Sequence, residues 1–278
     1  MNRLLLSRLF QRRTVLLAAV MLAGLMLLSW VFPLLASQDP SDTNVLSRLK
    51  APSAEHWLGT DELGRDLLAR IAAGGRHSMA IAAVTAVAAT LAGTLLGLLA
   101  GFVRPLEAPL MRLVDAMMAL PDLLLAIALV AILGPSAWTV VLALSLVYTP
   151  RVARVVRAST LVVRELPFIE AARALGMSDA RVLFRHVLPQ LTSPLLVQAS
   201  FIFAYAILAE AALSFLGVGM PPDVPTWGTM VAGSQTYAHT SLGVVLYPGL
   251  AIVLTSLSLQ LLGDGVRDLL DPRLQRTN

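Results

Sequence analysis

The chain has 278 residues, of which 57% are hydrophobic and only 14% are charged, with a net charge of +4. A soluble domain carries about 25% charged residues, so these charges are too few to cover a water-facing surface. The apolar surplus must face lipid, which excludes an ordinary soluble protein and predicts an all-α, polytopic membrane protein. The sequence has no cysteine, which excludes a disulfide framework and a thiolate metal site.

Six apolar runs are long enough to cross a bilayer as helices, which rise ~1.5 Å per residue. In chain order they are residues 15–35, 79–102, 113–133, 138–156, 191–216 and 243–262. The first follows a basic segment, as in a signal peptide, but it is too long and lacks a small-residue cleavage site, so we expect it to be retained. The predicted divisions are the N-terminus with the first helix (1–35), an outside loop (36–78), a core of five helices (79–262) and a tail (263–278).

Basic residues lie mainly on one side of this predicted membrane. With the N-terminus in the cytoplasm, 16 of the 21 lysines and arginines fall in inside segments. The five that fall outside are Arg48, Lys50, Arg65, Arg70 and Arg76. This bias follows the positive-inside rule, and an even number of spans places both termini in the cytoplasm. The basic character therefore indicates membrane topology and not a nucleic-acid partner.

The inside loop 157–190 has the pattern of two short helices joined by a bend. Residues 170–175 favour a helix, and Gly176 is a natural C-terminal stop for it. Ser178 can cap a second helix, with Asp179 near its positive end. Pro189 should break the chain where it re-enters the membrane. Either the loop merely links two spans, or the first helix, with Ala171 and Ala172 at its surface, seats in a groove of another protein.

Within this loop the sequence resembles the EAA loop of ABC importer permeases. The residues that carry the resemblance are Glu170, Ala171, Ala172, Gly176, Leu188 and Pro189. His186 departs from the general pattern, which has an apolar residue there. The ending Arg-His-Val-Leu-Pro is nevertheless similar to that of the dipeptide, oligopeptide and nickel branch.

Three further stretches resemble the C-type permeases of that branch. They are residues 56–66 (HWLGTDELGRD), residues 209–219 (AEAALSFLGVG), and residues 248–273, which begin PGLAI and contain LGDGVRDLLDPR. Together with the inside loop they extend over most of the chain, in the order and at the membrane depths that the family shows.

The resemblance implies a type I ABC importer permease fold in a bacterial cytoplasmic membrane. It implies a cytoplasmic coupling helix that docks into an ATPase subunit through Glu170, Ala171, Ala172, Arg173, Ala174, Leu175 and Gly176, followed by an ending at His186, Leu188 and Pro189. The implied partners are a homologous second permease, two ATPase subunits, an extracytoplasmic binding protein and membrane lipid. The implied substrate is a dipeptide, an oligopeptide, glutathione or a nickel chelate.

The chain itself should not hydrolyse ATP by a P-loop. A P-loop needs Gly-Lys-Ser/Thr, and the only lysine, Lys50, follows Leu49 in the predicted outside loop. ATP and magnesium are therefore expected on partner subunits, with no catalytic residue or cofactor on this chain. The four histidines, His56, His77, His186 and His239, are scattered, and we expect no metal site.

Charged residues within the spans are the remaining candidates. Placing a carboxylate such as that of Glu210 in lipid costs free energy. We therefore expect Glu210, together with Ser214, at the pore or at a subunit interface. The alternative is that Glu210 lies at a helix end and reaches water. Asp115 and Asp122 lie in the inner part of the third span. Arg112 and Asp115 have the spacing of a local ion pair on one helix face.

The outside loop has the pattern of an amphipathic helix. Asp61 with Arg65 and Asp66 with Arg70 are spaced four residues apart, as helical ion pairs are. These residues and Trp227 form a candidate docking surface for the binding protein, although the helix could instead be a structural brace.

Two other classes of protein are weighed against the importer. A secondary transporter driven by an ion gradient would need ionisable residues or broken helices at the midplane of several spans, where only Glu210 is a fair candidate. An intramembrane hydrolase would need a motif such as Gly-x-Ser-x-Gly or His-Glu-x-x-His, and the spans contain neither.

Overall fold

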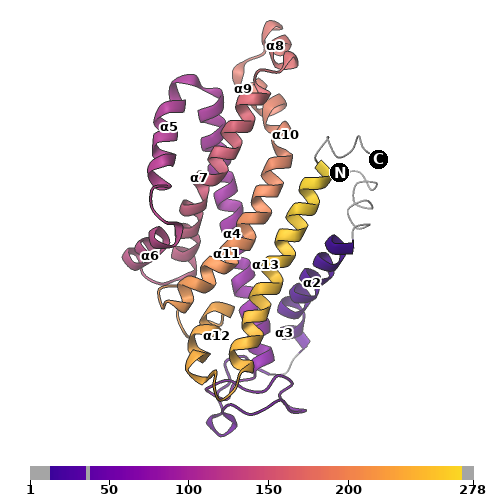
Figure 1. Ribbon diagram of the computed structural model, residues 1–278, viewed down its shortest axis with the longest axis vertical. Coiled ribbons are helices and arrows are strands. Elements are labelled where there is room, and N and C mark those ends of the chain that lie inside the picture. Colours follow the sequence, from indigo (N-terminus) through magenta and orange to yellow (C-terminus); the bar gives the residue numbers. More distant parts are fainter. Residues whose placement is uncertain (1–12, 36–37, 271–278) are drawn as a thin grey trace.

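A computed structural model describes residues 13–35 and 38–270 and confirms the all-α prediction. The helices form an elongated bundle (Figure 1). In the described residues the only β contact is an isolated bridge between Thr60 and Asp66. Five of the basic residues counted above lie outside the described residues: Arg3, Arg8, Arg12, Arg273 and Arg276.

Five helices are long and apolar enough to cross a membrane, and a bent helix pair brings the number to six if the pair is one span. The five are α2 (Arg13–Trp30) with its short continuation α3 (Phe32–Leu35), α4 (Leu67–Phe102), α7 (Ala137–Val163), α11 (Thr192–Phe215) and α13 (Gly243–Leu270). The prediction of about six spans is therefore confirmed.

The third span is broken, and the expectation of one helix over 113–133 is wrong. Two helices, α5 (Arg104–Met117) and α6 (Asp122–Leu133), meet at 85°. Pro121 precedes α6, and a proline disfavours helical conformation in the residue before it, which ends the first helix. The predicted link 103–112 is itself helical, because Pro105 stands in the first turn of α5, where its missing N–H costs nothing.

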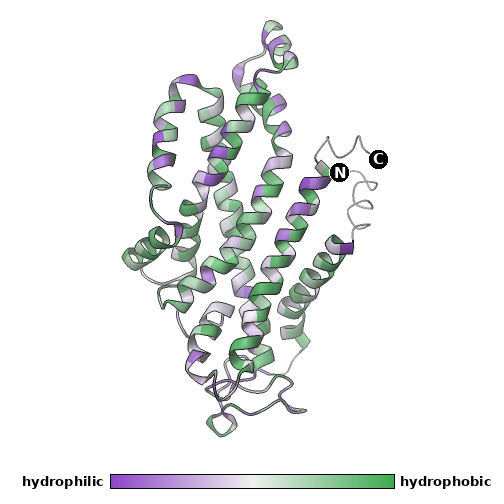
Figure 2. Ribbon diagram, in the orientation of Figure 1, coloured by the Kyte–Doolittle hydropathy of each residue, from purple (hydrophilic) through white to green (hydrophobic). Residues whose placement is uncertain are grey.

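Three helices are longer than the apolar runs from which they were predicted. α4 begins at Leu67 instead of residue 79, α7 continues to Val163 instead of 156, and α13 continues to Leu270 instead of 262. Hydropathy reports the part of a helix that matches lipid, whereas arginine and alanine continue a helix beyond it. Figure 2 shows hydrophilic residues at several helix ends, and also within α5 and α7.

α4 packs closely on α7 through a stripe of glycines. A Cβ atom at Gly93 would lie 2.4 Å from Cβ of Val152, and one at Gly97 would lie 2.6 Å from the carbonyl oxygen of Ala153. Gly101 continues the stripe one turn further. Small residues four apart allow helix backbones to approach in membranes, so this Gly-xxx-Gly-xxx-Gly pattern fixes the central helix pair.

The two ends of the bundle carry different short elements. α8 (Pro167–Ala174) projects beyond one end, and α12 (Trp227–Ser234) lies at the other (Figure 1). The beginning of α2 meets the last part of α13, since a Cβ atom at Gly265 would lie 2.8 Å from Val15. Both described termini of the chain are therefore close together.

Candidate functional site

The predicted inside loop forms a folded projection at the α8 end of the bundle, which we call the elbow (residues 167–191). It consists of α8, α9 (Asp179–Val182), a π-helical turn η2 (Leu183–Val187) and α10 (Leu188–Gln190). Leu191 then leads into α11. The predicted sequence of short helix, sharp bend and second helix is confirmed.

Gly176 makes the bend. Its φ is +80°, a left-handed conformation that residues with a side chain rarely adopt. Its N–H donates to the carbonyl of Arg173 at 2.9 Å, and the next N–H, from Met177, donates to Ala172 at 3.1 Å. These bonds satisfy carbonyls at the end of α8, as expected for a helix stop. Ser178 does stand at the N-cap of α9, but its side chain makes no capping bond.

The two sides of α8 have different surroundings. Ile169 and Ala172 are buried in the same apolar cluster as Val182 and Val187 of the elbow. The expectation that Ala172 lies on the surface is therefore wrong, because the bend folds α9 and η2 against that side of α8. Ala171 is exposed as expected.

The outer side of α8 leaves an apolar side chain in water. Leu175 is 87% exposed at the tip of the elbow, and Phe184 in η2 is also exposed. Glu170 is exposed, and it has no ion-pair partner within residues 13–35 and 38–270. α8 therefore has an exposed carboxylate in its first turn, near its positive end, and an exposed leucine directly after its last residue.

Two side chains hold the elbow together. Arg173 forms an ion pair with Asp179 (3.4 Å between Nε and Oδ1), and its guanidinium lies 5.1 Å from the ring centroid of Phe102 at the end of α4. The ring of His186 lies 6.4 Å from that of Phe168. His186 therefore packs on α8, which gives this departure from the family pattern a structural role.

Pro189 explains the wide turn before α11. It has no N–H to donate, so a regular α-helical ladder cannot pass through it. The N–H of Leu188 donates instead to Leu183, five residues back, which defines the π-helical turn. The predicted break at Pro189 is confirmed as a change of helix type followed by a new helix from Thr192.

At the opposite end, residues 60–66 form a tight turn, and the predicted amphipathic helix is wrong for this segment. The carboxylate of Asp61 accepts the backbone N–H groups of Leu63 and Arg65, both at 2.9 Å. Asp66 caps α4 by accepting the N–H of Ala69 at 2.8 Å. The aspartates thus bond to nearby backbone in place of a helical ladder.

The ion pairs of this turn are only partly as predicted. Asp61 pairs with Arg65 (2.6 Å) and also with Arg70 (3.2 Å). Asp66 does not pair with Arg70, because its carboxylate caps α4 and contacts His56 Nδ1 at 2.9 Å. Asp61 and Asp66 are buried, so they fix the shape of the turn and do not face a partner.

Two glycines explain the Leu-Gly-Thr-Asp-Glu-Leu-Gly-Arg-Asp stretch. Gly59 and Gly64 have φ values of +83° and +76°. A Cβ atom at Gly64 would lie 1.8 Å from the carbonyl oxygen of Asn44. Only glycine fits there, so the motif packs the turn directly on the preceding backbone.

Trp227 is not on the surface, contrary to its expected place in a docking site. Its side chain is buried, and its Nε1–H donates to the carbonyl of Ile71 at 2.9 Å. Its backbone N–H donates to Ser78 Oγ at 3.1 Å. The first residue of α12 therefore fastens that helix to α4.

Glu210 is completely buried inside the subunit, which contradicts its expected position at a pore, an interface or a water-exposed helix end. Its two carboxylate oxygens accept Ser78 Oγ–H at 3.1 Å and Ser214 Oγ–H at 2.9 Å. Ser214 in turn accepts the N–H of Met220 at 3.2 Å. The carboxylate thus joins α11 to α4 and to the following loop.

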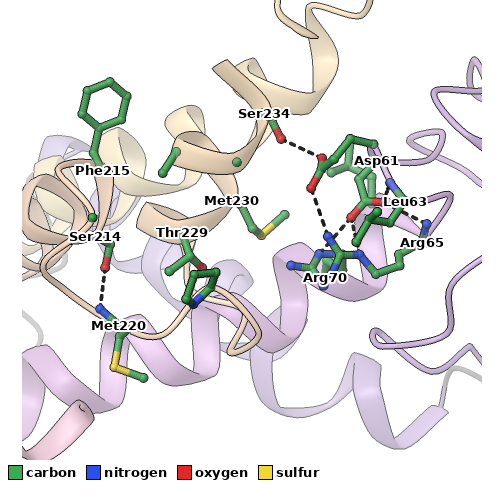
Figure 3. Close-up of a pocket in the computed structure, with 16 residues that line it drawn as sticks. Asp61, Leu63, Arg65, Arg70, Ser214, Phe215, Met220, Thr229, Met230 and Ser234 are labelled. Carbon is green, nitrogen blue, oxygen red and sulfur yellow. Dashed lines mark hydrogen bonds and ion pairs between the residues drawn. The ribbon is translucent and has the colours of Figure 1, made fainter. Parts of the chain in front are cut away.

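A hollow of about 340 Å³ opens beside this network (Figure 3). It is lined by residues of the 60–66 turn, the first turn of α4, the end of α11, and α12. Glu62 connects two of its walls, because it pairs with Arg65 at 3.1 Å and accepts Ser234 Oγ–H at 3.3 Å. The predicted outside residues thus come together, but as the wall of a hollow.

Three ion pairs that were not predicted from the sequence join α7 to the broken span. Arg151 pairs with Asp122, Arg154 with Asp115 (2.6 Å), and Arg157 with Glu107. The expected local pair of Arg112 with Asp115 is wrong, because Asp115 faces α7. The signal was available: three arginines spaced by three residues on α7 share one helix face.

Within residues 13–35 and 38–270, no three His, Asp or Glu side chains are placed to hold a metal ion.

Comparison with known proteins gives three similarities. Residues 93–276 match the family described as "Binding-protein-dependent transport system inner membrane component". A di/tripeptide transport system permease protein of Pseudomonas aeruginosa is 45% identical over 87% of this chain and 82% of its own length. A dipeptide transport system permease protein of Alkalihalophilus pseudofirmus is 40% identical, covering 92% of this chain and 84% of that protein.

A solved structure also shares the fold. A chain of the MetNI methionine ABC transporter, in an inward-facing conformation, superposes with a TM-score of 0.58 over 71% of this chain and 95% of that chain. The two sequences are 20% identical, so this likeness concerns the helical architecture alone.

Proposed function

The chain belongs to the family of binding-protein-dependent transport system inner membrane components, and on that premise we propose that it forms one half of the conduit of an ATP-driven peptide importer. It is a multi-pass inner membrane protein. Its partners in this proposal are a homologous second permease, two ATPase subunits and an extracytoplasmic binding protein. Di- or oligopeptides are the proposed substrates because the relatives are named as dipeptide and di/tripeptide permeases.

The observation that carries the proposal is the elbow. It projects beyond the bundle (Figure 1), and it presents the exposed side chains of Leu175 and Glu170, the latter without an ion-pair partner in the described part of the chain. An apolar side chain in water favours contact with another protein. We assign this contact to the ATPase subunit, with Glu170, Ala171 and Leu175 facing the partner, and Arg173 and Gly176 maintaining the shape.

The elbow can transmit force because it is continuous with a span. α10 leads through Leu191 directly into α11, and the buried side of α8 packs against the same segment. A push on α8 therefore moves α11 as a rigid body, as domain closure requires. ATP and magnesium belong to the partner subunits in this scheme, since the only lysine, Lys50, is not part of a Gly-Lys-Ser/Thr motif.

The proposed orientation places the elbow and both termini in the cytoplasm. The described ends of α2 and α13 meet, and the elbow end carries most of the arginines. The opposite end, with its 340 Å³ hollow, then faces the binding protein. Glu62 and Arg65 are the charged residues of this rim that we expect to lie nearest to that partner.

The comparisons weaken the alternative that the chain is a secondary transporter driven by an ion gradient. The structure does have the two kinds of feature that such a transporter needs, a broken span and ionisable residues within the spans. The third span is broken, and the Arg151–Asp122 pair lies within the spans. The matching family is described as binding-protein-dependent, and the relatives are named as permease proteins of peptide transport systems.

Reconstitution distinguishes the two functions. The complete complex in proteoliposomes should take up dialanine only when ATP and the binding protein are present, and ionophores should not change the rate. Uptake driven by a proton or sodium gradient without ATP would overturn the proposal.

A further inference from the structure

An ion pair and two aromatic rings meet near the middle of the membrane-spanning helices. Arg151 is the fifteenth of the 27 residues of α7, and it pairs with Asp122 at the start of α6. Its guanidinium carbon lies 5.7 Å from the ring centroids of Tyr148 in α7 and Tyr205 in α11. Tyr205 is itself the fourteenth of 24 residues. Three helices thus bring these groups together at one depth.

This cluster is open on one side. The side chains of Arg151 and Asp122 are each 39% exposed, although charged groups at this depth are expensive in contact with lipid. The charged surface continues toward the elbow, through the more exposed pair of Arg154 with Asp115. A face with charges from the midplane to one end is suited to water, and we take it as a wall of the conduit.

We propose that Arg151, Asp122 and the exposed ring of Tyr205 contact both charged termini of a peptide as it crosses the membrane, while the buried ring of Tyr148 packs against Arg151. This inference rests on the proposed function of peptide import. Arginine binds a carboxylate through two parallel hydrogen bonds, so it matches the peptide C-terminus. A carboxylate and the face of Tyr205 match the N-terminal ammonium, and this ring already contacts the guanidinium of Arg151 in the structure.

Charge balance explains why the site is a pair. Without peptide, Asp122 neutralises Arg151, so the pair carries no net charge. A zwitterion supplies one charge of each sign, so the pair can open and each member can take a new partner. Asp122 stands directly after the break between α5 and α6, where the backbone is not held in one continuous helix.

The test uses the absence of cysteine from the native chain. Tyr205→Cys in the complete complex is treated with a positively charged, membrane-impermeant methanethiosulfonate, and labelling of this chain is measured. The matched control is Val253→Cys, on an exposed apolar stripe of α13 that also contains Leu246, Leu250 and Leu257. We expect Tyr205→Cys to react at least about tenfold faster than the control, because only water carries the reagent.

Protection by peptide then tests recognition. Dialanine with free termini should slow the labelling of Tyr205→Cys, whereas N-acetyl-dialanine amide at the same concentration should not. Adding Arg151→Gln should keep the thiol reactive and reduce the apparent affinity of the protecting dialanine at least about tenfold, the factor that corresponds to the loss of one of the two charge-assisted hydrogen bonds.

Three results would overturn the inference. They are labelling no faster than at Val253→Cys, equal protection by both peptides, and full protection in the Arg151→Gln variant. ATP-driven uptake is measured separately on the wild-type complex. If uptake depends on ATP while protection fails, this inference falls and the proposed function stands; if uptake does not depend on ATP, the proposed function fails.

Discussion

Replacing Leu175 by glutamate should separate the permease from its ATPase without unfolding it. The side chain is 87% exposed in the isolated chain, so folding gains little from it. Full burial of a leucine contributes ~1.5–3 kcal/mol, and 87% of that is ~1.3–2.6 kcal/mol available on docking. The loss corresponds to a dissociation constant for the ATPase raised about ten- to eightyfold, and a buried, unpaired glutamate would raise it further.

The assay is titration of the purified ATPase subunit onto the permease pair in nanodiscs, followed by ATP-driven uptake in proteoliposomes. Leu46→Glu is the matched control, since Leu46 is 92% exposed in η1 (Val45–Ser47) at the opposite end of the bundle. We expect Leu46→Glu to bind the ATPase as the wild type does. Wild-type affinity in Leu175→Glu, or an equal loss in both variants, would refute the docking assignment.

Three further substitutions test the geometry. Gly176→Pro should lose ATPase binding, because proline cannot adopt a φ of +80°. Gly176→Asn should keep most of the binding, because asparagine tolerates the left-handed conformation. Equal co-purification of the ATPase with both variants would argue against a role for the bend. Glu210→Ala should destabilise the fold by about 2–5 kcal/mol, because the buried hydroxyls of Ser78 and Ser214 lose their acceptor. Glu210→Gln should cost less than half of that. In nanodiscs the melting temperature should therefore be lowest for Glu210→Ala, intermediate for Glu210→Gln and highest for the wild type. Gly97→Ala should cost about 1–3 kcal/mol from overpacking, while Gly24→Ala, with no atom within 4 Å of the added Cβ, should be neutral; equal melting temperatures would contradict the packing.

The sequence predicted features that follow from local rules. Membrane spans depend on the length of an apolar run, so α2, α11 and most of α4, α7 and α13 were found. The bend at Gly176 follows from the chemistry of glycine at a helix end. Both rules act within a few residues and need no knowledge of what the segment packs against.

The features that it missed depend on tertiary contacts or on competition between rules. Pro121 breaks the third span, but a hydropathy average is insensitive to one proline. The spacing of Asp61 and Arg65 predicted an ion pair on a helix. The ion pair forms, but the segment is a turn and not a helix. The burial of Glu210 depends on Ser78, which is 132 positions away in the chain.

One helix connects the three regions discussed above, and this arrangement constrains how transport can work. α11 begins at the elbow, presents Tyr205 at mid-depth, and places Glu210 in the network with α4 and the loop before α12. The elbow is joined to it without a flexible linker, and the Glu210 network fastens its far end to α4. In the proposed coupling scheme, a push on α8 passes to α11 and from there to α4 through the hydrogen bonds of Glu210. Because α4 is locked to α7 by the glycine stripe, the natural moving unit is α4, α7 and α11 together, and it carries Arg151 and Tyr205 with it.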